Sequence, residues 1–89
     1  MIKIIRAKHI DQKILRVYFS DNSWGDYDLQ PLIDRQTELV LPLNDDAYFQ
    51  QFFLELGALC WPNGLELSPG GIHRNLEERQ QLHYETKVA

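Results

Sequence analysis

The fold is decided in the stretch Cys60-Trp61-Pro62-Asn63-Gly64-Leu65-Glu66-Leu67-Ser68-Pro69. The proline after the tryptophan keeps that tryptophan extended, and the asparagine–glycine pair signals a turn. A Leu-x-Leu pattern then restarts a short strand, before serine as N-cap and proline as first helical residue begin a helix. The stretch carries no reactive pattern, so it predicts a structural corner and no active site.

Upstream of this corner, alternating side chains predict two strands. Residues 2–10 are rich in β-branched side chains, and their alternation slips at Ile4-Ile5, which indicates a bulge or a twist. Residues 13–20 alternate without interruption between two faces. One of these faces carries Leu15, Val17 and Phe19. A two-residue turn at residues 11–12 joins the two predicted strands in antiparallel order.

A third strand over residues 24–29 completes a predicted antiparallel meander. The reversal before it is Asp21-Asn22-Ser23, in which the asparagine is best able to adopt a left-handed conformation. The aspartate of this reversal is expected to serve the turn. One face of the third strand carries Trp24, Asp26 and Asp28.

Short helices are predicted where prolines and capping residues follow the strands. Pro31 is expected to begin a one-turn helix over residues 31–34, and the Asp28 side chain to accept from backbone amides that follow it. Asn44 or Asp45 caps a second short helix. Its predicted inner face carries Ala47, Tyr48 and Phe52. Residues 49–55 are either a continuing helix or a short helix followed by a strand.

Together these elements predict an α+β fold. A small antiparallel sheet, formed by the N-terminal three-stranded meander plus a short hairpin, packs with short helices and a C-terminal helix. We expect a single domain over residues 1–89, with its core within about residues 2–74 and a C-terminal helix or tail over residues 75–89. That last helix is thinly apolar, so it lies either on the surface or against a partner chain. The C-terminal end of the chain, residues 86–89, is expected to fray.

Composition limits the functions that this chain can have. A formal charge of -4, without a basic stripe, argues against nucleic-acid binding by the isolated domain. The mild basic excess lies at Lys3, Arg6, Lys8 and Lys13. The single cysteine, Cys60, excludes an internal disulfide and fits a reducing compartment. Since no apolar run is long enough to cross a membrane, we expect a cytoplasmic protein without a membrane partner.

Candidate chemistry is sparse, so we predict no catalytic, cofactor-binding or metal-binding residues. Carboxylates that suggest acid–base chemistry occur in three local groups, which are Asp21 with Asp26 and Asp28, Asp45 with Asp46, and Glu77 with Glu78. Non-catalytic roles are favoured for these groups, and for Asp28 a structural one. No two histidines have the spacing of zinc ligands. We expect Cys60 to be a buried, inert thiol, and both tryptophans to be core rings whose indole N–H meets a partner.

Several motifs together resemble a bacterial family of domains of unknown function that is numbered 2442. They are Val17-x-Phe19-x-Asp21, Asp28-Leu29-x-Pro31-Leu32, Pro42-Leu43-x-Asp45, Phe49 and Trp61-Pro62-Asn63-Gly64-x-Glu66-Leu67-Ser68-Pro69. The resemblance covers roughly residues 5–73. It implies a small α+β domain, found alone or fused to a helix-turn-helix, and in some members adjacent to another small domain as in a toxin–antitoxin pair.

The chain departs from this family at three places. The family usually has glycine where Asn22 stands and aspartate where Glu66 stands. It also often ends soon after the Ser-Pro helix, so the segment from Asn75 is an extension or the start of a partner-binding helix. Because the family has no established catalytic residues, the resemblance implies no activity.

These observations predict a non-enzymatic interaction or regulatory module that binds another protein, such as an antitoxin-like member of a two-gene pair. A nucleic-acid-associated regulatory domain that acts in an oligomer or complex is the alternative, and a small enzyme using Asp26 and Asp28 is a distant third. A symmetric dimer is also predicted, because a short sheet has edges to protect.

Overall fold

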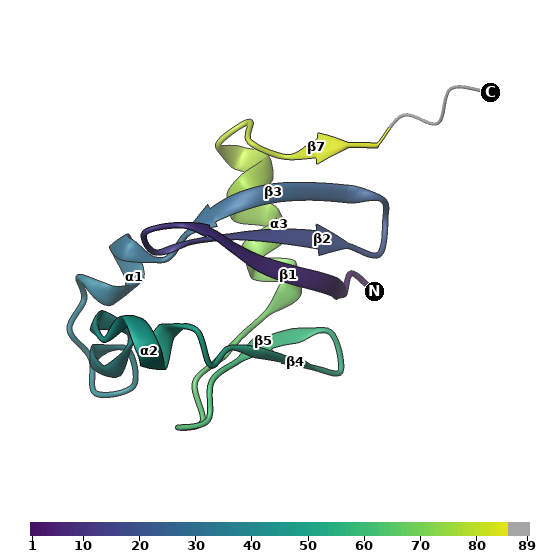
Figure 1. The fold of residues 1–89 in the computed structure, drawn as a ribbon. Helices are drawn as coiled ribbons and strands as arrows, with labels where there is room; N and C mark the ends of the chain where they lie inside the picture. Colours follow the sequence, from purple (N-terminus) through teal and green to yellow (C-terminus); the bar gives the residue numbers. More distant parts are fainter. Residues whose placement is uncertain (86–89) are drawn as a thin grey trace.

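The structure is a computed structural model, and it describes residues 1–85. It contains two antiparallel sheets (Figure 1). The first has the order β1-β2-β3-β7, with β1 at Ile4–Asp11, β2 at Ile14–Phe19, β3 at Ser23–Asp28 and β7 at His83–Tyr84. The second has the order β4-β5-β6, with β4 at Phe53–Glu55, β5 at Ala58–Cys60 and β6 at Glu66–Leu67.

The helices are α1 (Gln30–Ile33), the 3-10 helix η1 (Leu41–Asn44), α2 (Asp46–Phe49) and α3 (Pro69–Glu78). The predicted α+β class is confirmed.

The N-terminal meander follows the predicted order of strands, with each strand bound shifted by one or two residues. A register irregularity lies between Ile4 and Arg6, so the predicted bulge is confirmed. The reversal before β3 has Asn22 at φ 69°, in the left-handed region as expected. The first turn, however, lies one residue later than predicted, because Asp11 pairs with Ile14 and continues the ladder.

The short helices confirm the predicted caps, while two details were wrong. Asp45 accepts a hydrogen bond from the Tyr48 backbone amide and caps α2. The inner face of α2 is Phe49, which is 1% exposed, whereas Ala47 is exposed. Pro31 lies at the second position of α1, since Gln30 already has helical geometry. The ambiguous segment 49–55 is a short helix followed by the strand β4.

The predicted corner is confirmed around Trp61. The Trp61 amide donates to the Leu65 carbonyl at 3.0 Å, and the Gly64 amide donates to the Trp61 carbonyl at 3.1 Å. Gly64 has a φ of +96°, which L side chains rarely adopt. Ser68 then caps α3 by accepting from the Gly71 amide at 3.3 Å. The corner therefore reverses the chain and starts the helix as the sequence predicts.

The C-terminal segment differs from the predicted helix or tail over residues 75–89. Helix α3 ends at Glu78, and Gln80, at φ 58°, turns the chain back. The short strand β7 then pairs with β3. The glutamates and glutamines of this segment favour a longer helix. The chain instead forms a strand at His83–Tyr84, because this strand can pair with the free edge of β3. The prediction of fraying at residues 86–89 lies outside the described residues.

The core lies between the first sheet, α3 and the second sheet. Helix α3 passes behind the first sheet in Figure 1, while α1 and α2 lie at one end and β4–β5 below. Gly25 allows the close contact between α3 and β3, because a Cβ there would lie 2.8 Å from Leu76 Cδ1. The inward face of β2 is fully buried. It consists of Leu15, Val17 and Phe19, the face that the sequence predicts.

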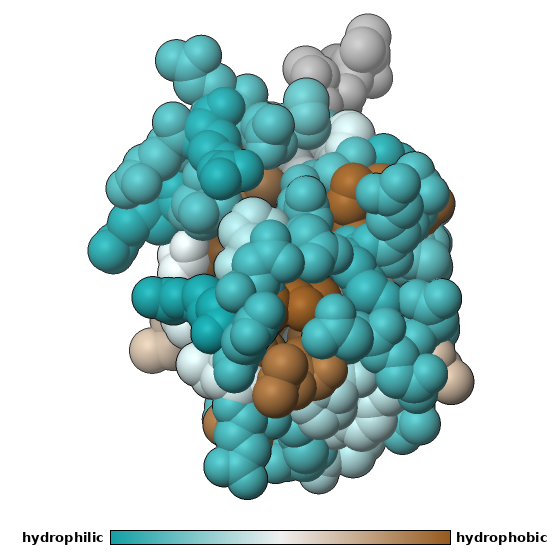
Figure 2. Space-filling view, turned by 90° about the vertical axis from the view of Figure 1, so that its left-hand side faces the viewer, coloured by the Kyte–Doolittle hydropathy of each residue, from teal (hydrophilic) through white to brown (hydrophobic). Residues whose placement is uncertain are grey.

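The remaining surface is mainly polar. On the side where α1 and α2 lie, Figure 2 shows a small group of apolar side chains among polar ones. Leu39 and Leu41, which connect these helices, are 45% and 46% exposed. Within residues 1–85, no helix is long and apolar enough to span a membrane.

Candidate functional site

The most distinctive surface of the protein is the side of the first sheet that faces away from α3. Since side chains alternate along a strand, the burial of Leu15, Val17 and Phe19 on β2 places the intervening side chains on the opposite side. Cross-strand pairing brings their neighbours to the same side. We call this surface the outer face; it carries Arg6, Lys8, Ile14, Arg16, Tyr18, Trp24, Asp26, Asp28 and His83.

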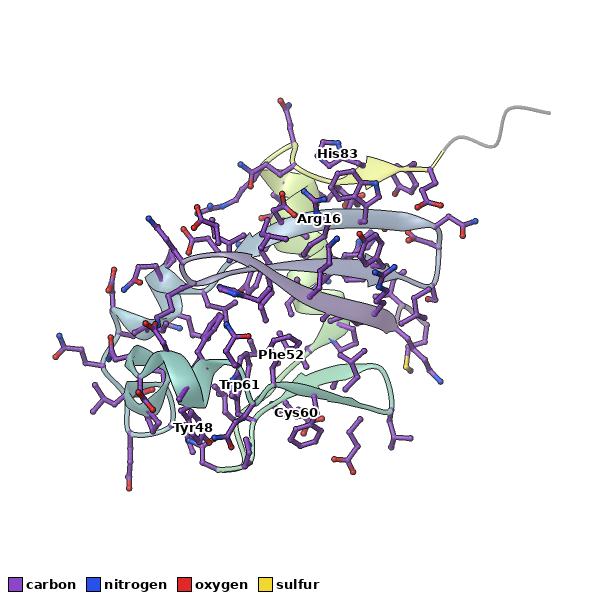
Figure 3. All side chains as sticks on the ribbon, viewed as in Figure 1. Arg16, Tyr48, Phe52, Cys60, Trp61 and His83 are labelled. Carbon is purple, nitrogen blue, oxygen red and sulfur yellow. The ribbon has the colours of Figure 1, made fainter. Side chains whose placement is uncertain are left out.

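Trp24 is the centre of the outer face, contrary to its predicted place in the core. Its ring stacks on the His83 ring, with centroids 4.4 Å apart and planes 29° apart. The Arg16 guanidinium carbon lies 4.6 Å from the Trp24 centroid, in cation–π contact. Figure 3 shows Arg16 and His83 near each other on the first sheet. The alternation of side chains along β3 predicts that Trp24 lies on the same face as Asp26 and Asp28, and this prediction is confirmed.

Arg16 is held on the outer face by a bidentate ion pair with Asp26. Its Nε donates to Asp26 Oδ1 at 2.7 Å, and its terminal nitrogen donates to Asp26 Oδ2 at 3.0 Å. This hydrogen bonding raises the pKa of Arg16 above its ordinary value. Arg6 lies 5.1 Å from the Tyr18 centroid in a second cation–π contact. The outer face is therefore an ordered arrangement of cations and aromatic rings.

A polar cleft of about 330 Å³ opens at one end of the outer face. It brings together Asp26 and Asp28, two of the carboxylates that suggested acid–base chemistry. Both carboxylates are already engaged: Asp26 binds Arg16, and Asp28 accepts from the Gln30 backbone amide at 2.9 Å. The Asp28 contact is the predicted structural role. The cleft is completed by Ile14, Arg79, Gln81 and His83.

The corner that carries the longest family motif, residues 61–69, lies apart from the outer face, with Trp61 and Leu65 buried and Pro62, Asn63 and Gly64 exposed. Trp61 is 1% exposed, and its indole N–H donates to the Phe49 carbonyl at 3.0 Å, as the sequence predicts. The Asn63 side chain donates to the Leu39 carbonyl at 3.0 Å, and its backbone amide donates to the Tyr48 hydroxyl at 2.9 Å. These contacts join the corner to Leu39, which precedes η1, and to α2 itself, and they build structure without forming a reactive group.

The mild basic excess at Lys3, Arg6, Lys8 and Lys13 does not form one surface. Lys13 binds Asp46 at 2.7 Å, with only 12% of its side chain exposed. This hydrogen bond lowers the pKa of Asp46. Lys3 lies apart, where it packs close to Gly57. Only Arg6 and Lys8 remain on the outer face, because they pair with Tyr18 and Arg16.

The histidines are far apart and hold different parts of the fold. His73 Nε2 donates to Asp21 Oδ2 at 2.9 Å, which joins α3 to the turn before β3. The sequence did not predict this contact, since 52 positions separate the two residues. His9 bonds to the Gln12 carbonyl and the Gln50 side chain. Among residues 1–85, no group of three His, Cys, Asp or Glu side chains could hold a metal ion.

Cys60 has the buried position that the sequence predicts. It is 6% exposed on β5. Burial raises the pKa of its thiol, and the nearby Glu66 and Glu55 carboxylates act in the same direction. A raised pKa leaves little thiolate at neutral pH, so the geometry does not favour nucleophilic chemistry at this residue.

Comparison with known proteins identifies the family. The family model described as "Protein of unknown function (DUF2442)" matches residues 4–78. That span contains the meander, the corner and α3, and it confirms the resemblance seen in the sequence motifs. No curated protein and no solved structure matches the chain. The chain belongs to the family described as "Protein of unknown function (DUF2442)".

Proposed function

We propose that this chain is a non-enzymatic, cytoplasmic protein-interaction module that binds a partner protein through its outer face. The observation that carries the proposal is the group of Arg16, Tyr18 and Trp24, which remain part-exposed on one sheet face. Tryptophan, tyrosine and arginine are the residues most enriched at binding hot spots. The two carboxylates of the adjacent cleft are held by other protein groups, which favours binding over catalysis.

The geometry of the outer face suits binding because its side chains are ordered in advance. Arg16 is held by Asp26 on one side and by the Trp24 ring on the other. A side chain that is already ordered loses less conformational entropy when a partner covers it. His83 stacks on Trp24 from β7, so the C-terminal strand adds to the same surface.

The resemblance to the family suggests where the partner is found. Some members lie beside another small domain, so the product of the adjacent gene is the first candidate. In this proposal the chain is the antitoxin-like member of the pair, and it acts by covering a surface of its partner.

Co-expression with the adjacent gene product tests the proposal. We expect the untagged partner to co-purify with the tagged wild-type chain and to be lost from Trp24→Ala. Phe53→Ala is the matched control, since Phe53 is an aromatic residue that is 42% exposed on the second sheet. Circular dichroism would establish that both variants are folded. Failure to recover a partner, or equal recovery with Trp24→Ala, would contradict the proposal.

A nucleic-acid-associated function, in an oligomer or complex, is the alternative. It is favoured by one observation: the cations Arg6, Lys8 and Arg16 alternate with the rings of Tyr18 and Trp24 on an open sheet. Single strands bind to such surfaces by stacking on aromatic rings and by phosphate contacts. Binding to single-stranded DNA or RNA at low salt, lost in Lys8→Glu, would support this alternative, and its absence would remove it.

A further inference from the structure

The tip of the β4–β5 hairpin contains a leucine in an unfavourable position. Leu56 and Gly57 form a two-residue turn in which both φ angles are positive, 50° and 84°. Such turns favour asparagine at the first position, because branched apolar side chains are strained in the left-handed region. Leu56 is nevertheless 91% exposed. Both the backbone conformation and the solvent exposure of this leucine are unfavourable in an isolated chain.

The hairpin tip is held firmly against the N-terminal segment. The Ile4 amide donates to the Gly57 carbonyl at 2.9 Å. A Cβ at Gly57 would lie 2.6 Å from the Lys3 Cβ, so the two backbones are in close contact. The Leu56 side chain therefore projects from a turn that the N-terminal segment holds in place, so it loses less conformational entropy when it enters a complementary surface.

An apolar groove of about 360 Å³ lies directly beside the tip. Its volume is at the lower end of the range of about 300–1,000 Å³ that is typical of binding pockets. Its apolar lining comes from Leu56 itself and from Met1, Ile2, Ala58 and Pro69, while Lys3 and Glu66 supply one charge of each sign. A groove of this kind accepts an apolar side chain and offers a charged contact on two sides.

We propose that the hairpin tip and this groove form the interface with a second copy of the chain. A two-fold axis requires each surface patch to be complementary to itself. The patch carries both an exposed apolar side chain and an apolar groove, so in the proposed pair Leu56 of each copy enters the groove of the other. In the proposed pair, the Lys3 of each copy meets the Glu66 of the other, since both residues line the groove. This interface is separate from the outer face, so it does not depend on the proposed function.

Leu56→Asn is the first test, because it should move folding stability and self-association in opposite directions. Asparagine suits the left-handed turn, so the melting temperature of the dilute variant should rise by roughly 2–6 °C. Sedimentation over a range of concentrations should show a dimer for the wild type. The dissociation constant of Leu56→Asn should rise by more than about tenfold, since two buried leucines are lost.

Gln36→Asn is the matched control. Gln36 has a φ of 56° and is exposed, as Leu56 is, but it is polar and lies between α1 and η1. We expect this variant to gain thermal stability while its dimer remains unchanged. The pair of variants separates the relief of backbone strain from the loss of an apolar contact.

Charge reversal tests the symmetry itself. Lys3→Glu and Glu66→Lys should each weaken the dimer, whereas the double variant should restore it, because each copy then supplies the opposite charges. A wild type that stays monomeric at the highest concentration reached would overturn the proposal. A dimer that is unaffected by Leu56→Asn would also overturn it.

Discussion

The two tryptophans of this protein lie in opposite environments. Trp61 is 1% exposed, and its ring lies 6.0 Å from Phe49 and 6.4 Å from Phe52. Trp24 is part-exposed and lies between a guanidinium and an imidazole on the outer face. Figure 3 shows the two surroundings, with Trp61 near Phe52 and Tyr48 below, and Arg16 and His83 above. Residue type alone predicts the same buried environment for both tryptophans.

The difference arises from strand alternation and from what covers each face. Trp61 follows β5, whose three residues are all buried, since this strand lies in the interior. Trp24 has an outward position on β3, and its inward neighbours are Ser23 and Gly25, which are small and buried. Small inward residues let α3 approach β3 closely, so the large ring is left on the side without a helix. One tryptophan therefore stabilises the fold, and the other remains accessible to a partner.

The largest expected effect is that of Trp61→Ala. Removing a buried aromatic ring and its hydrogen bond should lower the free energy of unfolding by about 3–5 kcal/mol. Trp24→Ala should lower it by only about 1 kcal/mol, the scale of a cross-strand pair. Urea denaturation of both variants measures the contrast. Equal losses for the two variants would show that the two rings do not differ in structural role.

Gly25→Ala tests the inward side of the strand that carries Trp24. The added Cβ would lie 2.8 Å from Leu76 Cδ1 and 2.9 Å from the Gln81 carbonyl oxygen, so α3 and the following turn must shift. We expect a loss of about 1–3 kcal/mol. Gly71→Ala is the control, because only ordinary contacts with Ser68 surround that position in α3. A Gly25→Ala variant with the melting temperature of the wild type would refute this packing argument.

Gly64→Val tests the backbone conformation of the corner, because an added Cβ meets no neighbouring atom. Nothing lies within 4 Å of a Cβ at this position, so the expected loss of about 1–2 kcal/mol comes from backbone strain at positive φ alone. Gly64→Asn should retain most of the stability, because asparagine tolerates this region. The melting temperatures of the two variants distinguish strain from steric overlap. An unchanged melting temperature for Gly64→Val would show that the turn is not a constraint on the fold.

Acid should weaken the contact between the turn before β3 and α3. Partial burial acts to raise the pKa of Asp21, but hydrogen bonds from the Ser23 hydroxyl, the Ser23 amide and His73 outweigh it and lower that pKa. A carboxylate whose pKa is lower in the folded state stabilises it fully above the unfolded pKa, near 4. That contribution is then lost as the pH falls through the folded pKa. Chemical denaturation between pH 7 and pH 3 should show a smaller decline for Asp21→Asn than for the wild type.

The sequence predicted the parts of the fold that depend on neighbouring residues. The alternation in β2, the left-handed Asn22, the Asp45 cap and the Ser68 cap all follow from local patterns. The strand β7 does not, because two residues carry too little periodicity and the glutamates and glutamines before them favour helix. The contact between Asp21 and His73 depends on how α3 packs, which no local pattern specifies.

The outer face was partly predictable. Alternation places Trp24 with Asp26 and Asp28, but the general tendency of tryptophan to be buried led to the wrong environment for its ring. The contribution of His83 could not be found from sequence, since it depends on β7. The cleft that joins Asp26, Asp28 and Arg79 likewise requires the return of the chain after α3.

The accessibility of Trp24 in the presence of the partner tests the central claim most directly. Trp61→Phe leaves Trp24 as the only tryptophan, and Trp24→Phe leaves only Trp61. Without a partner, acrylamide should quench the fluorescence of Trp24 strongly and that of Trp61 weakly. When the adjacent gene product is added, we expect the quenching of Trp24 to fall while that of Trp61 stays constant. A bound partner that leaves the quenching of Trp24 unchanged would contradict the account, because the outer face would then lie outside the interface.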